Sequence, residues 1–288
     1  MRVRSRSLCL IILTLYTALC TAEPAIWQVK GRHNTVYLLG TIHLLPGDEA
    51  LPGNIDKAYR EAEQLLMEID MDDLDPVATQ ALMFKLGLQT GSGTLATQLD
   101  AQTHRQLQAT ASRLGFDATM LAQFQPWLAA LTLQQLQLAK LGFAAAAGVE
   151  MQLVQLAIAD SKPINGLESL EEQFSLFAGL DDQAQVALLK QTLDELDEGP
   201  EELQRLLTAW RSGDVQQMRK TLQQGHADDP ALFAALTTDR NKRWLTILRP
   251  LLETQRDDYL VAVGALHMIG TEGLVELLQR AGYDVRRH

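Results

Sequence analysis

Two copies of one short pattern, far apart in the chain, constrain the fold more than any other feature of the sequence. Residues 36–43 read VYLLGTIH and residues 259–267 read YLVAVGALH, so each copy is an apolar, partly β-branched run that closes on Gly-x-x-His. Such runs are typical of buried strands. The sequence therefore predicts two similar strand ends, which present His43 and His267 as candidate site residues.

Each copy is followed by a loop, a helical pattern and another short strand, over residues 36–69 and 259–286. A predicted hairpin, with a first strand at residues 25–29 and a turn at 31–34, leads into the first copy. Helices that bridge strands of the same direction imply parallel pairing through right-handed crossovers. We therefore predict an α/β fold with a central mixed, largely parallel sheet built from two βαβ half-repeats.

The first 22 residues have the pattern of a secretory signal peptide. Three arginines precede an uncharged run at residues 8–19, and Cys20-Thr21-Ala22 ends it with small side chains. The run is shorter than the roughly 20 residues that a spanning helix needs. We expect an exported protein of the bacterial periplasm, with one domain over residues 23–288 and no membrane span after cleavage. An uncleaved anchor, or a lipoprotein linked through Cys20, is the less favoured alternative.

The charge and the cysteines exclude several classes of partner and site. Cleavage removes three arginines and no acids, so the formal charge of −11 would become −14. So acidic a protein is a poor candidate for binding nucleic acid or anionic lipid. Both cysteines lie in the leader, so a metal in the mature chain must be held by histidine or by oxygen donors.

Helical patterns dominate between the two copies and predict an insertion over residues 76–250, with one strand near 163–168. Residues 44–53, rich in proline and glycine, are expected to form a loop where a substrate would meet His43. Asp229-Pro230 predicts a helix start. Arg240 falls on the apolar stripe of that helix, where a charge must be paired or reach solvent.

Acidic residues follow the predicted strands and complete a candidate site. Glu68 and Glu168 stand near the carboxyl ends of their strands, where ligands gather in parallel sheets. Two imidazoles and one or two carboxylates are a common ligand set for a divalent metal. Gly40 and Gly264 would let a backbone or a ligand approach closely.

Each of these residues also has a purely structural interpretation. A histidine at a strand end is often a hydrogen-bonded structural group, Glu68 fits the solvated face of an edge strand, and Glu168 fits the region of a helix N-cap. Glu150 fits a first-turn acid that favours the helix dipole. Gly-x-x-His has no metal-ligand spacing of its own, and the more specific His-Glu-x-x-His is absent from the sequence.

Several segments together resemble a known family. They are YLLGTIHLLP, LLMEID, GVEMQLVQLAIADSKPINGLESLEEQ, DRNKRW and VAVGALHMIGTEGLVELLQRAGYDV. In this order they resemble the TraB/GumN family, which is related to the Tiki proteins, over nearly the whole mature chain. The resemblance implies an α/β fold with a central sheet, two Gly-x-x-His half-repeats and a helical insertion, similar to the erythromycin esterase and ChaN-like folds.

The resemblance also implies which residues form the site. The family's two histidines match His43 and His267, and its acids match Glu68 and Glu168. Its Arg-Asn pair matches Arg240 and Asn241, and Glu150 stands where the family favours an acid. Animal Tiki members are described as metal-dependent proteases, and bacterial TraB-like members are linked to shutting down a peptide pheromone. No substrate is implied for exported bacterial members.

The leading hypothesis is an exported, metal-dependent hydrolase of peptide or amide bonds, similar to a metalloprotease. Mn, Co or Zn would be held by His43 and His267, with Glu68 and Glu168 as further ligands. Glu68 is alternatively the general base, while Arg240 and Asn241 would orient a carboxylate or the developing oxyanion. Two alternatives stay open: a protein that sequesters a peptide or small ligand, and a metal-free esterase with a histidine base. The substrate and the oligomeric state are not indicated.

Overall fold

The computed structural model describes residues 23–43, 45–47, 49–224 and 230–288. A six-stranded sheet in the order β6-β4-β7-β2-β1-β8 forms its centre. Its strands are β1 (Ile26–Lys30), β2 (Thr35–Thr41), β4 (Gln64–Met67), β6 (Ile164–Gly166), β7 (Tyr259–Gly264) and β8 (Asp284–Arg287). β1 is antiparallel to β2 and β8, and the β2–β7, β7–β4 and β4–β6 pairs are parallel. The predicted α/β fold with a mixed, mostly parallel sheet is confirmed.

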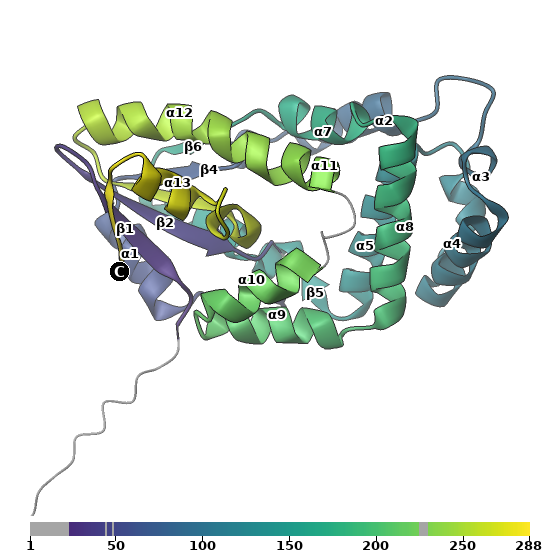
Figure 1. The fold of residues 1–288 in the computed structure, drawn as a ribbon, viewed down its shortest axis with the longest axis horizontal. Coiled ribbons are helices and arrows are strands. Elements are labelled where there is room, and N and C mark those ends of the chain that lie inside the picture. Colours follow the sequence, from purple (N-terminus) through teal and green to yellow (C-terminus); the bar gives the residue numbers. More distant parts are fainter. Residues whose placement is uncertain (1–22, 44, 48, 225–229) are drawn as a thin grey trace, which may run out of the picture.

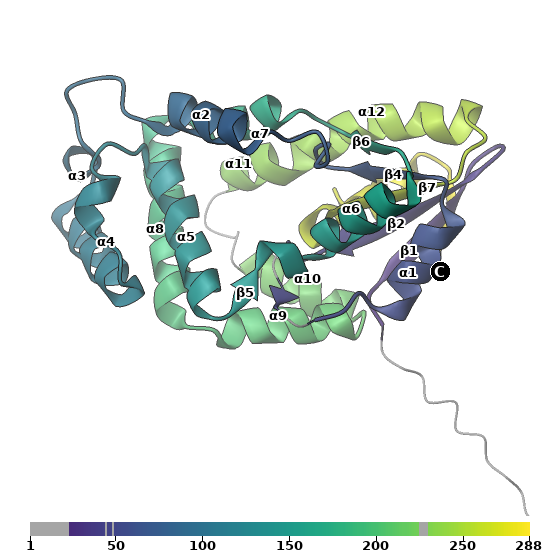
Figure 2. The same cartoon turned by 180° about the vertical axis from the view of Figure 1, so that it is seen from behind.

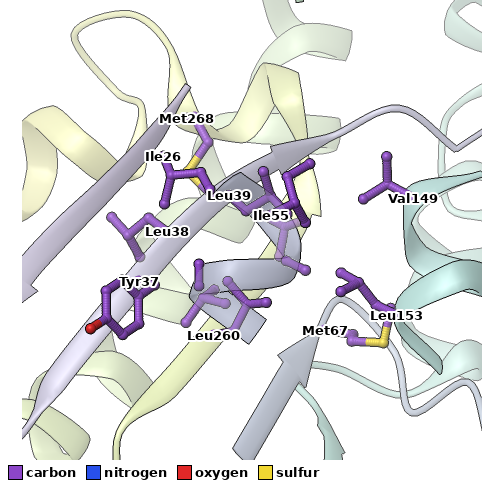
Figure 3. Packing of buried hydrophobic residues seen from close by; sticks show 14 of the residues in the cluster. Ile26, Tyr37, Leu38, Leu39, Ile55, Met67, Val149, Leu153, Leu260 and Met268 are labelled. Atoms are coloured by element: carbon purple, nitrogen blue, oxygen red, sulfur yellow. The ribbon is translucent and has the colours of Figure 1, made fainter. Parts of the chain in front are cut away.

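The two predicted copies lie side by side as the central strands β2 and β7. Every residue of both strands is buried, which explains why their sequences are continuously apolar rather than alternating. Their register pairs Thr41 with Gly264, so the two strands end together. Leu38, Leu39 and Leu260 pack with Ile55 and Leu153 in the core that Figure 3 displays.

Helices cover both faces of the sheet. α1 (Gly53–Glu61) and α6 (Val149–Asp160) lie on one face, and α12 (Asp239–Thr254) and α13 (Leu274–Arg280) on the other, as Figures 1 and 2 show together. From β2 the chain crosses through α1 to β4 on one side, whereas from β7 it crosses through α13 to β8 on the other. The carboxyl ends of β2 and β7 therefore form a topological switch point, the usual ligand site of such sheets.

The long segment between the copies is mainly helical and has a small core of its own. Its other α-helices are α2 (Pro76–Gly87), α3 (Leu95–Gln98), α4 (Ala101–Leu114), α5 (Pro126–Lys140), α7 (Leu170–Ala178), α8 (Asp182–Glu198), α9 (Glu201–Arg211), α10 (Val215–Gln224) and α11 (Pro230–Phe233). Leu107, Leu133, Leu189 and Leu193 belong to a cluster separate from the core around the sheet. Among the described residues, no helix is both long and apolar enough to cross a membrane.

Several boundaries differ from the sequence prediction. Within residues 44–53, expected to be loop throughout, Leu45–Pro46 forms β3 and pairs with β5 (Phe143–Ala144), because main-chain pairing here does not need the proline N–H. The second copy leaves the sheet at Gly264 and turns into the 3₁₀ helix η4 (Ala265–Met268), so His267 lies in a turn rather than on a strand. The expected signal peptide and Asp229 lie outside the described residues.

The helix predicted to start at Pro230 is not uniform. The π-helix η3 (Ala234–Thr238) separates α11 from α12. A π-turn adds a residue to the helix and rotates everything after it relative to the preceding turn, and such bulges often occur at functional sites. Arg240 is the second residue of α12, so its direction depends on this bulge.

Candidate functional site

His43 is hydrogen-bonded to the buried carboxylate of Glu150. It lies two residues beyond the end of β2, and its Nδ1 is 2.6 Å from Oε1 of Glu150. The hydroxyl of Thr41 donates a hydrogen bond to the same oxygen. The His43 side chain is 63% exposed, whereas that of Glu150 is only 8% exposed. The charge of Glu150 raises the pKa of His43 to about 9.

The close approach of α6 to the end of β2 makes this contact possible. Gly148 caps the N-terminus of α6, and a Cβ there would clash with the main-chain oxygen of His43. Val149 N also donates to Ile42 O at 3.3 Å. Through Gly148 and Val149, the N-terminus of α6 packs and hydrogen-bonds against the residues that follow β2. This contact places Glu150, in the first turn of α6, beside the imidazole of His43.

Glu68 follows β4 directly, on the other side of β7 from His43. Its Oε1 accepts a hydrogen bond of 2.8 Å from Gly264 N. A Cβ on Gly264 would stand 3.3 Å from His43 Nε2 and 3.2 Å from Glu68 Oε1, so both atoms face the bare backbone of this glycine. Gly264 thus separates the imidazole of His43 from the carboxylate of Glu68, and its missing side chain leaves room between them.

Arg240 occupies the interior of the site. Its Nη2 lies 2.5 Å from Glu68 Oε2 and 2.5 Å from Glu168 Oε1, and its Nε donates to Glu168 Oε2 at 3.2 Å. Nη1 donates to Leu236 O at 3.1 Å. Burial on its own raises the pKa of Glu68, but His267, Arg240, His43 and the Gly264 N–H outweigh it and lower the pKa to about 2. Glu68 is therefore ionised, and Arg240 neutralises it.

His267 is buried beside this guanidinium and is neutral, because burial lowers its pKa to about 3. Its Nε2 is 3.1 Å from Arg240 Nη1, and its Nδ1 is 2.7 Å from Asn241 Oδ1. Arginine can only donate, so Nε2 is the acceptor and Nδ1 carries the proton. Asn241 Nδ2 donates to the main-chain carbonyls of His267 and Glu272. The Oδ1 of Asn241 is therefore free to accept the hydrogen bond from Nδ1–H of His267.

The structure therefore brings the predicted site residues together, with the exception of Gly40. His43, Glu68, Glu168 and His267 meet at the carboxyl ends of the parallel strands, with Glu150 behind His43 and Arg240-Asn241 behind His267. Gly264 lies close to both His43 Nε2 and Glu68 Oε1. Gly40 has a different place: a Cβ there would stand 2.9 Å from Ala265 Cα, so it allows β2 to pack against the turn that carries His267.

The expected four-ligand metal site does not fit these side-chain positions. Both oxygens of Glu168, one oxygen of Glu68 and Nε2 of His267 face the guanidinium of Arg240. In the part of the chain that the structure describes, no group of three or more His, Cys, Asp or Glu side chains is arranged to hold a metal ion. In the structure these candidate metal ligands surround the guanidinium of Arg240, and the metal site stays a prediction.

The sequence prediction missed three side chains of the site. Thr41 shares Glu150 with His43, and Gln173 donates to Glu68 Oε2 at 3.0 Å and to Glu168 at 3.4 Å. The ring of Trp244 lies 4.4 Å from that of His267 and 4.6 Å from Arg240 Cζ. Trp244 follows Arg240 by four residues on the same helix face, a spacing that could have revealed it. Gln173 had no comparable signal.

Comparison with known proteins agrees with the segments identified in the sequence. The profile of the TraB/PrgY/gumN family matches residues 25–287. The "Uncharacterized protein YbaP" of Escherichia coli (strain K12) is 29% identical over 258 residues, which cover 89% of this chain and 92% of that protein. An "Uncharacterized protein" of Treponema pallidum (strain Nichols) is 25% identical over 199 residues, 64% of this chain and 59% of that protein. No solved structure gives a significant match. The chain belongs to the TraB/PrgY/gumN family.

Proposed function

We propose that the protein is a hydrolase of peptide, amide or ester bonds in which His43 acts as the general base. The observation that carries the proposal is the 2.6 Å contact between His43 Nδ1 and the buried Glu150. A carboxylate in this position orients the imidazole and stabilises its protonated form, as required of a base that takes a proton from water. It leaves Nε2, which faces the space over Gly264, as the basic atom.

Arg240 and Asn241 act in this proposal as positioning residues. The donors of Arg240 engage Glu68, Glu168, Leu236 O and His267, so the guanidinium is not directed at a bound substrate. Asn241 orients His267 in the same way. Both residues therefore act through the groups that they hold, and this replaces the direct contact with an oxyanion that the sequence led us to expect.

A metal-dependent hydrolase is the second candidate, and one observation favours it. His43 Nε2 and Glu68 Oε1 lie within 3.3 Å of the same point over Gly264, and both are donors that divalent metals accept. Mn, Co or Zn bound there would polarise a carbonyl and lower the pKa of a bound water. His267 could join such a site only if Arg240 withdrew from its Nε2.

The test uses purified full-length protein and fluorogenic peptide and ester libraries. His43→Asn should abolish turnover, and near pH 9 and above, where the neutral imidazole is available in both proteins, Glu150→Gln should reduce it by about 10²- to 10⁴-fold, the usual range for general base catalysis. Activity that survives extensive chelation identifies the metal-free mechanism, whereas activity restored only by Mn, Co or Zn identifies the metal-dependent one. Full activity of His43→Asn would reject both. Saturable binding without any product would favour a sequestering protein instead.

We further infer that β2–α1–β4 and β7–α13–β8 are half-repeats, each of which begins with a strand and Gly-x-x-His. Their similar order of elements and their adjacent first strands support this. The periplasmic location and the signal peptide stay predictions, and cleavage after Ala22 is checked by N-terminal sequencing of the exported protein.

A further inference from the structure

A pocket lies on the β1–β8 side of the sheet, and its lining contains none of the candidate site residues, although Met268 directly follows His267 in η4. It has a volume of about 300 Å³ and is lined by Trp27 of β1, Arg219 of α10, Arg287 of β8, and Met268, Val275 and Glu276 around η4 and α13. Figure 1 labels β1, α10 and α13. The volume falls at the small end of ligand cavities, which span roughly 300–1,000 Å³.

The lining contains two arginines, Arg219 and Arg287, that form no ion pair with any carboxylate among the residues that the structure describes. Arg113, Arg211, Arg240 and Arg280 each form such a pair. Arg219 Nε is buried and has no hydrogen-bond partner among the residues described. A buried donor without a partner costs free energy, so its presence calls for a missing acceptor. The Arg287 guanidinium lies 5.2 Å over the ring of Trp27, which fixes it at the wall of the pocket.

The charges and the apolar walls together define what would fit. Two arginines and one acid, Glu276, give the lining a formal charge of +1, which matches a monoanion better than a dianion. Trp27, Met268 and Val275 offer apolar surface beside the guanidinium groups. A guanidinium fork matches the two oxygens of a carboxylate. We infer that this pocket binds a small organic monocarboxylate with an apolar body, such as an aryl or short alkyl acid.

The inference does not depend on the proposed hydrolase activity, and it is tested by binding alone. The chain has four tryptophans, so the indole N–H signals of the full protein can be followed by NMR, and Trp27→Phe assigns the one in the pocket. Titration with phenylacetate should shift the Trp27 signal saturably. Arg219→Gln and Arg287→Gln should each raise the Kd at least tenfold. Glu276→Gln should lower it several-fold, because the opposing charge is gone.

A control variant and two control ligands test whether the pocket recognises both the carboxylate and the apolar body of phenylacetate. Arg205→Gln in α9, an exposed arginine outside the pocket, makes the same charge change and should leave the Kd unaltered. Phenylacetamide, which is neutral, and inorganic phosphate, which lacks an apolar body, should both bind at least tenfold more weakly than phenylacetate. The inference is overturned if phenylacetate produces no saturable shift, if phenylacetamide or phosphate binds equally well, or if Arg205→Gln weakens binding as much as Arg219→Gln. Should Arg219→Gln fail to fold, Glu276→Gln and Arg287→Gln still give the answer.

Discussion

The buried carboxylates of the site are paired with one arginine at the level of single side chains. Arg240, whose side chain is 8% exposed, faces two carboxylates with side-chain exposures of 11% and 4%, Glu68 and Glu168. Taking such charges out of water is costly, and the cost is offset only while all the partners are present. The two carboxylates and the arginine should therefore be replaceable together but not singly.

Arg240→Met tests this balance. The variant leaves Glu68 and Glu168 buried without their main cation, so we expect it to lower the free energy of unfolding by about 3–5 kcal/mol. Urea denaturation at neutral pH measures the loss. Arg243→Met is the matched control, because Arg243 is 52% exposed and 3.7 Å from Glu168, and it should cost less than about 0.5 kcal/mol. The triple variant Arg240→Met, Glu68→Gln, Glu168→Gln should recover a large part of the loss; no recovery would contradict the argument.

Glu150 should set the pH range in which His43 works as a base. Its charge raises the pKa of His43 to about 9, so activity that needs the neutral imidazole should rise with pH towards that value. In Glu150→Gln the charge is removed, and the pKa of His43 should fall towards its ordinary 6.5. NMR titration of the His43 ring and the pH profile of hydrolysis should shift together. An unchanged His43 pKa in the variant would exclude Glu150 as the cause.

At the scale of elements, the two glycines of the repeated pattern have different physical roles. Gly40 lets β2 pack against η4, since a Cβ would stand 2.9 Å from Ala265 Cα, which is backbone and cannot yield locally. Gly264 instead faces the ends of His43 and Glu68 at 3.3 and 3.2 Å, and these side chains can adjust. One glycine thus serves the packing of a strand against a turn, and the other keeps the site open.

Alanine at each position separates these roles. Gly40→Ala should destabilise the fold by about 1–3 kcal/mol, as expected for overpacking. Gly264→Ala should keep nearly the wild-type melting temperature but reduce hydrolysis at least tenfold, because the methyl group fills the space over which His43 Nε2 and Glu68 Oε1 meet. Melting curves and initial rates of both variants provide the comparison. A stable and fully active Gly264→Ala would show that the space over Gly264 is not where substrate binds.

Across the whole molecule, periodicity and topology made much of the fold predictable. Continuous apolar runs identified β2 and β7, and the crossover rule predicted parallel pairing, which brings His43 and His267 to one sheet edge although 223 residues separate them along the chain. The direction of individual side chains was not predictable. Arg240 follows a π-helix and His267 lies in a 3₁₀ turn, and neither irregularity has a local pattern in the sequence.

The site as a whole should make stability depend on pH, with a maximum near pH 6.5. His267 has a folded pKa of about 3 against an ordinary 6.5, so the unfolded chain takes up its proton first and stability falls as the pH drops from 6.5 towards 3. Glu68, with a folded pKa of about 2 against 4.5, adds to this fall only below pH 4.5. His43 acts in the opposite sense: its folded pKa is raised to about 9, so the stability it contributes is lost as the pH rises from 6.5 to 9.

Between pH 4.5 and 6.5, His267 is the one of these three groups that titrates, while Asp70, whose pKa desolvation raises to about 6, changes stability in the opposite sense. There the free energy of unfolding should change by up to about 1.4 kcal/mol per pH unit through His267 alone. The difference between the free energies of unfolding of the wild type and His267→Gln, measured by urea denaturation across the window, should show this slope, because Asp70 contributes equally to both proteins. His33→Gln, in the exposed turn between β1 and β2, should keep the wild-type slope. If His267→Gln also kept it, the buried neutral imidazole would not be the group that couples folding of the site to pH.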